Sequence, residues 1–159
     1  MAVLIDNDST SDAHYWFLGM NGTDPRRTAN SFQLSTADTV DGCTFRALLD
    51  TGTSKVIAAR IETNNAGDPS GTLANANLTG TVTGTSNTTG TPVLHTVTFT
   101  APVALLASTT YWLVVQFDSE TGTDQYYRNF DSTANPYANG NLNKFAAAAW
   151  AAQATLDLF

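Results

Sequence analysis

Apolar side chains alternate with threonines along the segment "VLHTVTFTA", residues 93–101. A period of two places alternate side chains on opposite faces of a β-strand, and it does not fit the 3.6-residue period of a helix. Shorter segments repeat this alternation, with Phe32 and Leu34, residues 43–49, and residues 57–61 as further examples. The chain is therefore expected to fold from β-strands.

The segment "YWLVVQF", residues 111–117, is apolar on both of its predicted faces. One face would carry Tyr111, Leu113, Val115 and Phe117, and the other Trp112 and Val114. A strand with two apolar faces is typical of a position that is covered on both sides. We therefore expect residues 111–117 to form a central strand.

Clusters of Gly, Pro, Asn and Asp separate the alternating segments and predict turns. They lie at 19–25, 36–42, 64–71, 85–92, 119–124 and 133–141. Many short strands between such turns indicate an all-β protein. We predict a single antiparallel β-sandwich, jelly-roll-like and with little or no helix. It would occupy residues 21–159 and follow an N-terminal arm at residues 1–20.

One segment is ambiguous, namely "KFAAAAWAAQA", residues 144–154. Its alanines favour a helix by intrinsic propensity. However, it has no capping box and no apolar stripe, and small residues also pack well in a sandwich. We therefore expect a strand or loop around Trp150.

From Phe32 onward, the order of sequence features resembles the bacterial extracellular β-sandwich domains known as choice-of-anchor R. The matching pieces are "SFQL", "TFRALLDTGTSKVIAARIET", "AGDPSGTLAN", "TFTAPVALLASTTYWLVVQF" and "AAWAAQATLDLF", which span residues 31–159. The resemblance implies a β-sandwich that works outside the cell. It implies no catalytic residues.

The composition excludes some partners. The 159-residue chain has a net charge of −7, and only 13% of its residues are charged. Nucleic acid and anionic membranes attract basic surfaces, so we expect neither as a partner.

The only cysteine, Cys43, lies in an apolar alternation and is expected to be a core thiol. The N-terminus has no basic region before its short apolar run, so we expect no signal peptide.

The segment "ALLDTGTSKVIA", residues 47–58, resembles the active-site loop of an aspartic protease. Such an enzyme needs two carboxylates that share a proton, so one Asp50 would require a dimer. The sequence contains no later pair of apolar residues followed by glycine to support that loop. We therefore interpret Asp50 as part of a short hairpin turn, with no catalytic residue in the chain. A dimeric retroviral-type protease that uses Asp50 is an alternative.

Other candidate sites are weaker. His14 and His95 are 81 positions apart, and His95 lies in an inward position that favours a core histidine. The acidic segments 6–12 and 118–124 lack the full pattern of a calcium loop, so we interpret them as solvated loops. No metal and no cofactor are expected.

Aromatic residues suggest one further site. Trp16, Tyr126, Tyr127 and Tyr137 are candidates for a platform on which a sugar ring could stack. Aromatic residues in a small sandwich also serve as core or subunit contacts. An extracellular glycan-binding module is therefore an alternative function.

The preferred interpretation is a non-enzymatic structural protein on a virion surface, such as a capsid decoration or a tail- or fibre-associated subunit. Virion proteins fold in the cytoplasm and leave by lysis, so this interpretation requires neither a signal nor an anchor. We expect contacts with capsid or tail proteins and, by analogy with decoration and fibre proteins, a homo-oligomer such as a trimer. Surface glycans are an additional candidate partner. The expected location is the virion or the extracellular space.

Overall fold

The computed structural model describes residues 14–21, 24–51, 54–84, 92–119, 125–131, 140–153 and 157–158. Its strands are β1 (His14–Asn21), β2 (Asp24–Phe32), β3 (Asp38–Thr51), β4 (Val56–Asn65), β5 (Asp68–Leu73), β6 (Thr79–Thr83), β7 (Val93–Leu105), β8 (Tyr111–Phe117), β9 (Gln125–Asp131), β10 (Leu142–Ala146), β11 (Ala149–Gln153) and β12 (Asp157–Leu158). The described residues contain no helix, and every pair of these strands is antiparallel. The predicted all-β, sandwich-like class is confirmed.

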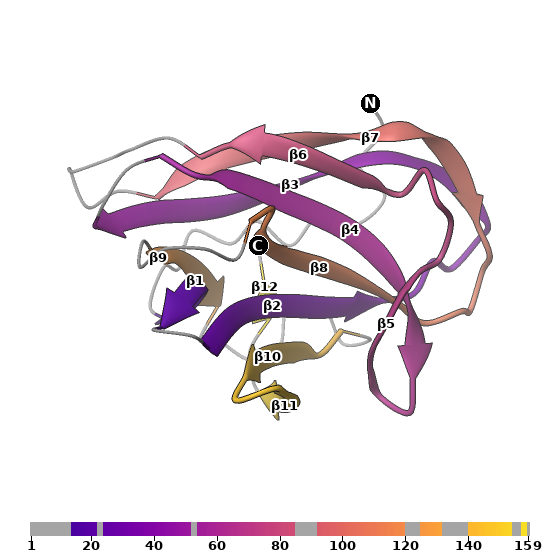
Figure 1. The fold of residues 1–159 in the computed structure, drawn as a ribbon. Coiled ribbons are helices and arrows are strands. Elements are labelled where there is room, and N and C mark those ends of the chain that lie inside the picture. Colours follow the sequence, from indigo (N-terminus) through magenta and orange to yellow (C-terminus); the bar gives the residue numbers. More distant parts are fainter. Residues whose placement is uncertain are drawn as a thin grey trace.

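The strands form two curled sheets that share β2 (Figure 1). Sheet A contains β1, β3, β7, β9 and β12, and sheet B contains β4, β5, β6, β8, β10 and β11. The first residues of β2 pair with β1, whereas residues 27–32 pair with β8 and β10. The chain passes from one sheet to the other through this strand.

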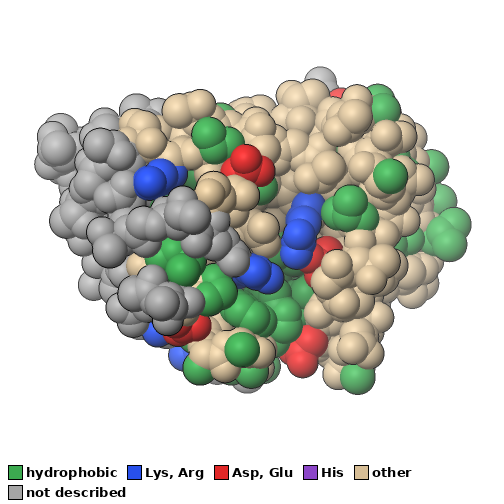
Figure 2. Space-filling view, viewed as in Figure 1, with side chains coloured by type: hydrophobic (Ala, Val, Ile, Leu, Met, Phe, Trp, Pro, Cys, Tyr) green, Lys and Arg blue, Asp and Glu red, His purple; other side chains and the backbone are tan. Residues whose placement is uncertain are grey.

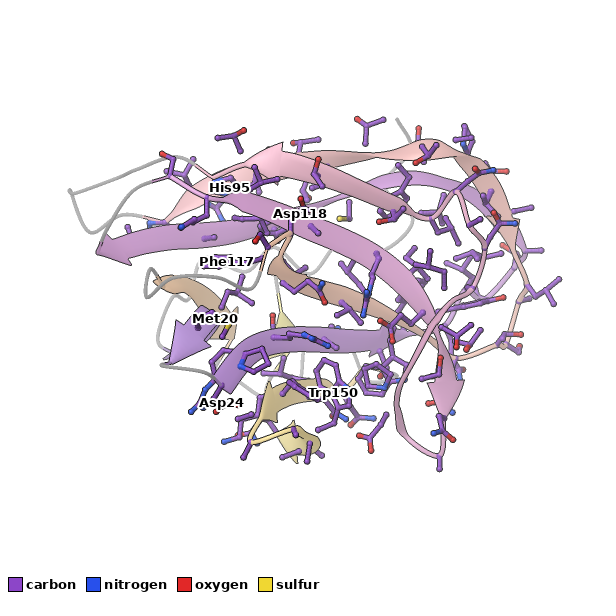
Figure 3. The ribbon with its side chains drawn as sticks, in the orientation of Figure 1. Met20, Asp24, His95, Phe117, Asp118 and Trp150 are labelled. Atoms are coloured by element: carbon purple, nitrogen blue, oxygen red, sulfur yellow. The ribbon has the colours of Figure 1, made fainter. Side chains whose placement is uncertain are left out.

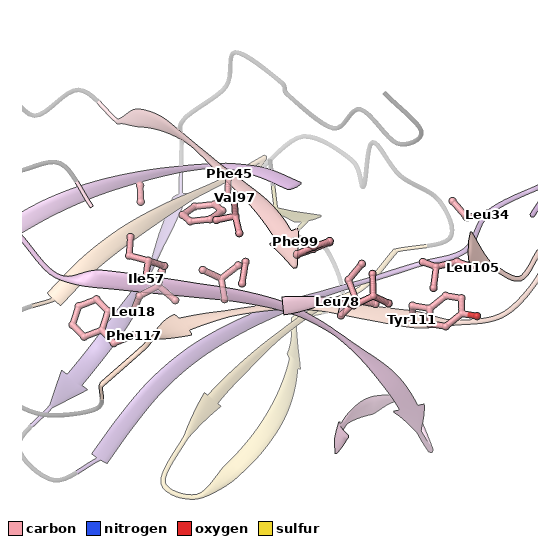
Figure 4. Close-up of a cluster of buried hydrophobic side chains, with 14 residues drawn as sticks. Leu18, Leu34, Phe45, Ile57, Leu78, Val97, Phe99, Leu105, Tyr111 and Phe117 are labelled. Atoms are coloured by element: carbon pink, nitrogen blue, oxygen red, sulfur yellow. The ribbon is translucent and has the colours of Figure 1, made fainter. Parts of the chain in front are cut away.

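The main core lies between the two sheets. It contains Leu18 from β1, Phe45 from β3, Ile57 from β4, Val97 from β7 and Phe117 from β8, which are all at most 1% exposed (Figure 4). The inward positions of β7 are its odd-numbered residues, and Thr96, Thr98 and Thr100 are exposed. The alternation in the sequence therefore predicted the inward face of this strand correctly.

β8 is a central strand, as predicted. It pairs with β2 on one side and with β4 on the other. Tyr111, Val115 and Phe117 belong to the main core, and Trp112 and Val114 belong to a second cluster on the opposite face of sheet B.

The two sheets also meet where β6 lies against β7. The Thr100 amide donates a hydrogen bond to the Asn77 carbonyl, and the Thr100 hydroxyl donates one to the Thr79 carbonyl, each at 3.1 Å. A Cβ atom on Gly80 would collide with the Thr98 carbonyl oxygen, and one on Gly42 would collide with the Val97 carbonyl oxygen. Glycine is therefore required on both sides of β7 for this close approach.

Two-residue turns close two hairpins of sheet B. Ala66 and Gly67 join β4 to β5 with φ values of 52° and 98°. Ala147 and Ala148 join β10 to β11 with φ values of 50° and 62°. Positive φ at both positions is the property of a type I′ turn. The expectation of a strand or loop around Trp150 is confirmed, because residues 142–153 form this second hairpin.

Two local expectations were wrong. Residues 38–42, expected within a turn, begin β3, where the register against β7 shifts between Val40 and Gly42. Pro102 of β7 lies in this irregular region, which tolerates a residue without an amide proton. In addition, residues 14–20 of the expected N-terminal arm lie in β1, which pairs with β2 and β9.

Candidate functional site

The structure places three of the four expected sugar-stacking residues on neighbouring strands. Trp16 lies on β1 opposite Arg128 of β9, and Tyr127 of β9 lies opposite Phe17. Tyr126 is the next position along β9. Tyr137 lies outside the described residues, so a platform formed by all four stays a prediction.

Asp50 lies near the end of β3, where the register against β9 shifts between Leu49 and Thr51. The prediction that β3 and β4 form a hairpin is wrong. β3 pairs with β7 and β9, whereas β4 pairs with β5, β6 and β8. The segment after Asp50 therefore connects sheet A to sheet B, because its two flanking strands belong to different sheets.

His95 and Cys43 both lie on the inward face of sheet A. His95 is 3% exposed, stacks on Phe45 with ring centroids 5.6 Å apart, and has its Nδ1 atom 2.9 Å from the Val93 carbonyl oxygen. This position agrees with the expected core histidine. Cys43 packs against the main core and is half-buried.

A different group of side chains forms the most developed polar arrangement in the described structure. It lies on the face of sheet B that points away from the main core, and we call it the B face. Strand register and alternation place several residues on it, among them Ala29, Arg60, Glu62, Trp112, Val114, Gln116, Asn143, Phe145 and Trp150.

The centre of the B face is apolar. Ala29, Trp112 and Val114 are at most 1% exposed, and Trp150 packs against them from the β10–β11 hairpin. The indole N–H of Trp112 donates a hydrogen bond of 2.9 Å to Asn64 Oδ1. Figure 2 shows hydrophobic side chains gathered in the lower middle of the view, with acidic and basic side chains beside them.

Glu62 places a carboxylate beside this apolar centre although it is only 1% exposed. Its Oε2 atom accepts a 2.6 Å hydrogen bond from the Gly71 amide. Its Oε1 atom lies 2.6 Å from Arg60 Nη2 in an ion pair that lacks hydrogen-bond geometry. Glu62 therefore has one well-directed donor and one charged neighbour.

Asn143 joins the two hairpins that border the B face. Its side-chain amide donates to Asp68 Oδ1 at 2.5 Å and to the Gly67 carbonyl at 3.3 Å. Asp68 and Gly67 lie at the β4–β5 turn, and Asn143 lies on β10. This contact holds strands from opposite ends of sheet B together.

Unpaired polar atoms concentrate on the same face. In the described part of the chain, five buried polar side-chain atoms have no hydrogen-bond partner, and four of them belong to the B face. Gln116 Oε1 and Asn143 Oδ1 are acceptors, Arg60 Nε is a donor, and the fourth atom, Glu62 Oε1, lies in the ion pair with Arg60. Buried polar atoms are usually paired, so such a concentration requires an explanation.

Aromatic side chains border the B face at β10 and β11. The Phe145 and Trp150 rings meet edge to face, with centroids 5.2 Å apart. The Arg27 guanidinium lies 4.8 Å from the centre of the Phe145 ring, in a cation–π contact. Figure 3 shows Trp150 below β2 and beside β10.

The side chains of the B face determine its chemistry. Among the described residues, no group of three or more His, Cys, Asp or Glu side chains is placed to hold a metal ion. The B face instead combines an apolar aromatic centre with buried polar side chains. No helix of the described structure is long and apolar enough to cross a membrane.

The sequence did not identify the B face. Arg60 and Glu62 occupy alternate positions of a strand, a pattern that normally indicates a solvated face. The available signal was the second apolar face of residues 111–117, because a neighbour of such a strand is also covered on that side.

Comparison with protein-family models finds no match, and comparisons with curated proteins and with solved structures find no significant match either. The resemblance to choice-of-anchor R domains therefore stays a prediction.

Proposed function

We propose that this protein is a non-enzymatic structural subunit of a virion surface, as a capsid decoration or a tail- or fibre-associated protein that acts through protein–protein contacts. The proposal rests on the charge-poor acidic composition, on the extracellular β-sandwich that the sequence resembles, and on one structural observation. That observation is the free edge of sheet B at β11.

β11 pairs only with β10 among the described strands. Its residues, "AWAAQ", carry no charge, and Ala149, Ala151 and Ala152 are exposed. A free strand edge offers unpaired N–H and C=O groups to another chain, and monomeric proteins usually protect such an edge with charges or proline. The unprotected edge supports assembly with further copies or with another particle protein, and a trimer is the expected homo-oligomer.

Analytical ultracentrifugation tests the assembly. The wild-type protein is expected to sediment as a multiple of its 16.9 kDa chain, and Ala151→Lys should shift it toward the monomer because a lysine protects the edge. Thr44→Lys is the matched control, since it adds the same charge at an exposed position of β3, which lies opposite Thr96 of β7 and away from β11.

A wild-type monomer that is unchanged by Ala151→Lys would contradict assembly through β11. The virion setting has its own test, which is the gene neighbourhood. Adjacent capsid, portal or tail genes support the proposal, whereas an adjacent secretion or sortase-type locus contradicts it.

A further inference from the structure

We propose that β11 pairs with the β11 strand of a second copy of this chain, antiparallel and with Ala151 of each copy at the centre. The inference rests on the proposed assembly through β11, and it adds the partner, the direction of the strands and their register. In Figure 1, β11 lies at the lower edge of the molecule beside β10, the one strand with which it pairs among those described.

The β10–β11 hairpin determines which backbone groups of β11 point outward. Its two-residue turn ends at Ala149, and a turn of this length is closed by a hydrogen-bonded pair of residues. Hydrogen-bonded and non-hydrogen-bonded pairs alternate along an antiparallel ladder. The odd-numbered residues of β11 therefore bond β10, whereas the backbone groups of Trp150 and Ala152 point away from it.

A hydrogen bond on the other side of β10 agrees with this assignment. The carbonyl of Asn141, just before β10, accepts a 2.9 Å hydrogen bond from the Ser31 amide, just before the end of β2. Odd-numbered residues of this segment thus face β2, and by alternation the even-numbered residues of β10 face β11. Lys144 is one of these, and it lies opposite Ala151.

The outward groups of β11 form a self-complementary set. Trp150 and Ala152 together offer two N–H donors and two C=O acceptors, placed symmetrically about Ala151. A second β11 that runs antiparallel presents the same groups in reverse order, so Trp150 of each copy lies opposite Ala152 of the other. The Ala152 carbonyl already accepts a 2.8 Å hydrogen bond from the Gln153 side chain, but a carbonyl oxygen can accept two. All four outward groups of each strand can therefore be paired.

Other registers pair fewer of these groups. With Trp150 at the centre, Ala152 would lie opposite Ala148, whose φ of 62° belongs to the turn and is not extended. With Ala152 at the centre, Trp150 would lie opposite the residue that follows Gln153, beyond the end of β11. The register centred on Ala151 is the one that uses every outward group of the strand.

The side chains of β11 fit a second copy of the same strand. The register places the large Trp150 ring beside the small Ala152 side chain of the other copy. At the centre it places Ala151 beside Ala151, in a non-hydrogen-bonded pair where the side chains are closest. Identical strands bring like residues together, and like charges directly opposite each other are destabilising. A strand without charge and with alanine at its centre avoids both repulsion and overlap.

The symmetry of this contact limits the assembly that it forms. An antiparallel contact between identical strands has two-fold symmetry and closes with two copies. It therefore produces a dimer, and a trimer would need a further contact elsewhere on the molecule. Sedimentation of the wild-type protein should show the dimer as its smallest assembled species.

Disulfide cross-linking tests the register. Residues of a non-hydrogen-bonded pair have Cα atoms about 4.5 Å apart, a distance that a disulfide spans. Ala151→Cys should therefore form a covalent dimer on oxidation with diamide. Ala149→Cys is the matched control and should stay uncross-linked. Ala149 is also an exposed alanine on the same face of β11, but its counterpart in the other copy would be displaced by about 13 Å along the strands.

A mixture of two variants extends the test. In the proposed register Ala149 lies opposite Gln153 of the other copy, so Ala149→Cys mixed with Gln153→Cys should cross-link although neither variant does so alone. The wild-type protein is the control for Cys43, the one native cysteine, which is half-buried. Mass spectrometry of the linked peptides identifies the joined residues, and thermal unfolding verifies that the variants fold.

Two results would overturn the inference. The first is that Ala151→Cys forms no covalent dimer, and the second is that Ala149→Cys alone cross-links as fast as Ala151→Cys. If Ala151→Lys nevertheless shifts the assembly toward the monomer, assembly through β11 stands and only the pairing with a second copy in this register fails. A wild-type monomer that Ala151→Lys leaves unchanged would contradict both proposals.

Discussion

Glu62 shows how a single buried acid can support an irregular piece of backbone. The register between β4 and β5 shifts between Glu62 and Asn64, and Gly71 adopts a φ of 77° in this region. A bulge of this kind removes an amide from the strand ladder. The Glu62 carboxylate accepts a hydrogen bond from the Gly71 amide and also faces Arg60.

Replacement of Glu62 should therefore destabilise the protein in two steps. Glu62→Gln keeps an acceptor for Gly71 but removes the ion pair, and it should cost about 1 kcal/mol. Glu62→Ala leaves both the amide and the Arg60 charge without a partner and should cost about 2–3 kcal/mol, less than for a fully buried pair because Arg60 is partly exposed. Urea unfolding measures both values.

Arg26→Ala is the comparison for Glu62. Arg26 pairs with Asp24 at 3.0 Å, but both side chains are at least 20% exposed, so the loss should stay below about 1 kcal/mol. Equal losses for Arg26→Ala and Glu62→Ala would show that burial of Glu62 has no energetic consequence.

The two type I′ turns give a matched pair of glycine tests. Ala148 has a φ of 62° without being glycine, so Ala148→Gly should raise the free energy of unfolding by about 0.5–1 kcal/mol. Gly67→Ala should lower it by about 1–2 kcal/mol, and the cause would be backbone strain alone because no atom lies within 4 Å of the new Cβ. A loss of stability in Ala148→Gly would contradict the turn geometry.

At the scale of elements, the contact of β6 with β7 closes the sandwich without a full strand ladder. Two hydrogen bonds from Thr100 and the absence of a side chain at Gly80 allow the strands to approach. The edge of β7 is covered in this way, whereas β11 pairs with β10 alone among the described strands. The two edges thus differ in their capacity to bind another chain.

Gly80→Ala should force β6 away from β7. The new methyl group would meet the Thr98 carbonyl oxygen and the Val97 side chain, and overpacking of this kind costs about 1–3 kcal/mol. Amide hydrogen exchange should report faster exchange at Thr100, whose N–H bonds Asn77. Thr81→Ala, at an exposed position of the same strand, is the control and should leave that rate unchanged.

At the scale of the whole molecule, β2 links both sheets into one structure. It contributes Phe32 to the main core and Ala29 to the cluster on the B face. A strand that belongs to both clusters prevents one sheet from separating while the other remains intact. The described structure is therefore expected to behave as one cooperative unit.

Thermal unfolding should show this cooperativity. Far-ultraviolet circular dichroism and tryptophan fluorescence should give coincident transitions, as a two-state domain does. Val114→Ala, on the B face, should lower both midpoints together by removing buried methyl groups, at a cost of about 1–3 kcal/mol. Separate transitions in the variant would show that sheet B unfolds by itself.

Part of the fold could be predicted from the sequence because strand alternation is a local property. The two faces of Tyr111–Phe117 and the inward positions of Val93–Leu105 were predicted correctly, since each follows from spacing within one segment. The pairing of β3 and β4 was predicted wrongly. A short connection with turn residues looks the same whether it closes a hairpin or crosses between sheets.

The candidate site could not be predicted from the sequence, for a related reason. Glu62 lies on a face where distant parts of the chain meet, since Trp150 of β11 packs against Ala29, Trp112 and Val114, and Asn143 of β10 bonds Asp68. Nothing in the residues near Glu62 distinguishes it from a solvent-facing acid. The predicted residues Trp16, Tyr126 and Tyr127 do lie on adjacent strands, but the sequence contained no information about that pairing.

The shared strand has a consequence for synthesis on the ribosome. About 80 residues separate Phe32 from Tyr111, its partner on β8, and at 5–20 residues per second their translation takes roughly 4–16 s. During this interval β2 can pair with β1, but its edges toward β8 and β10 have no partner in the nascent chain. Those edges are then open to other nascent copies, so a crowded polysome is where strand exchange between chains would begin.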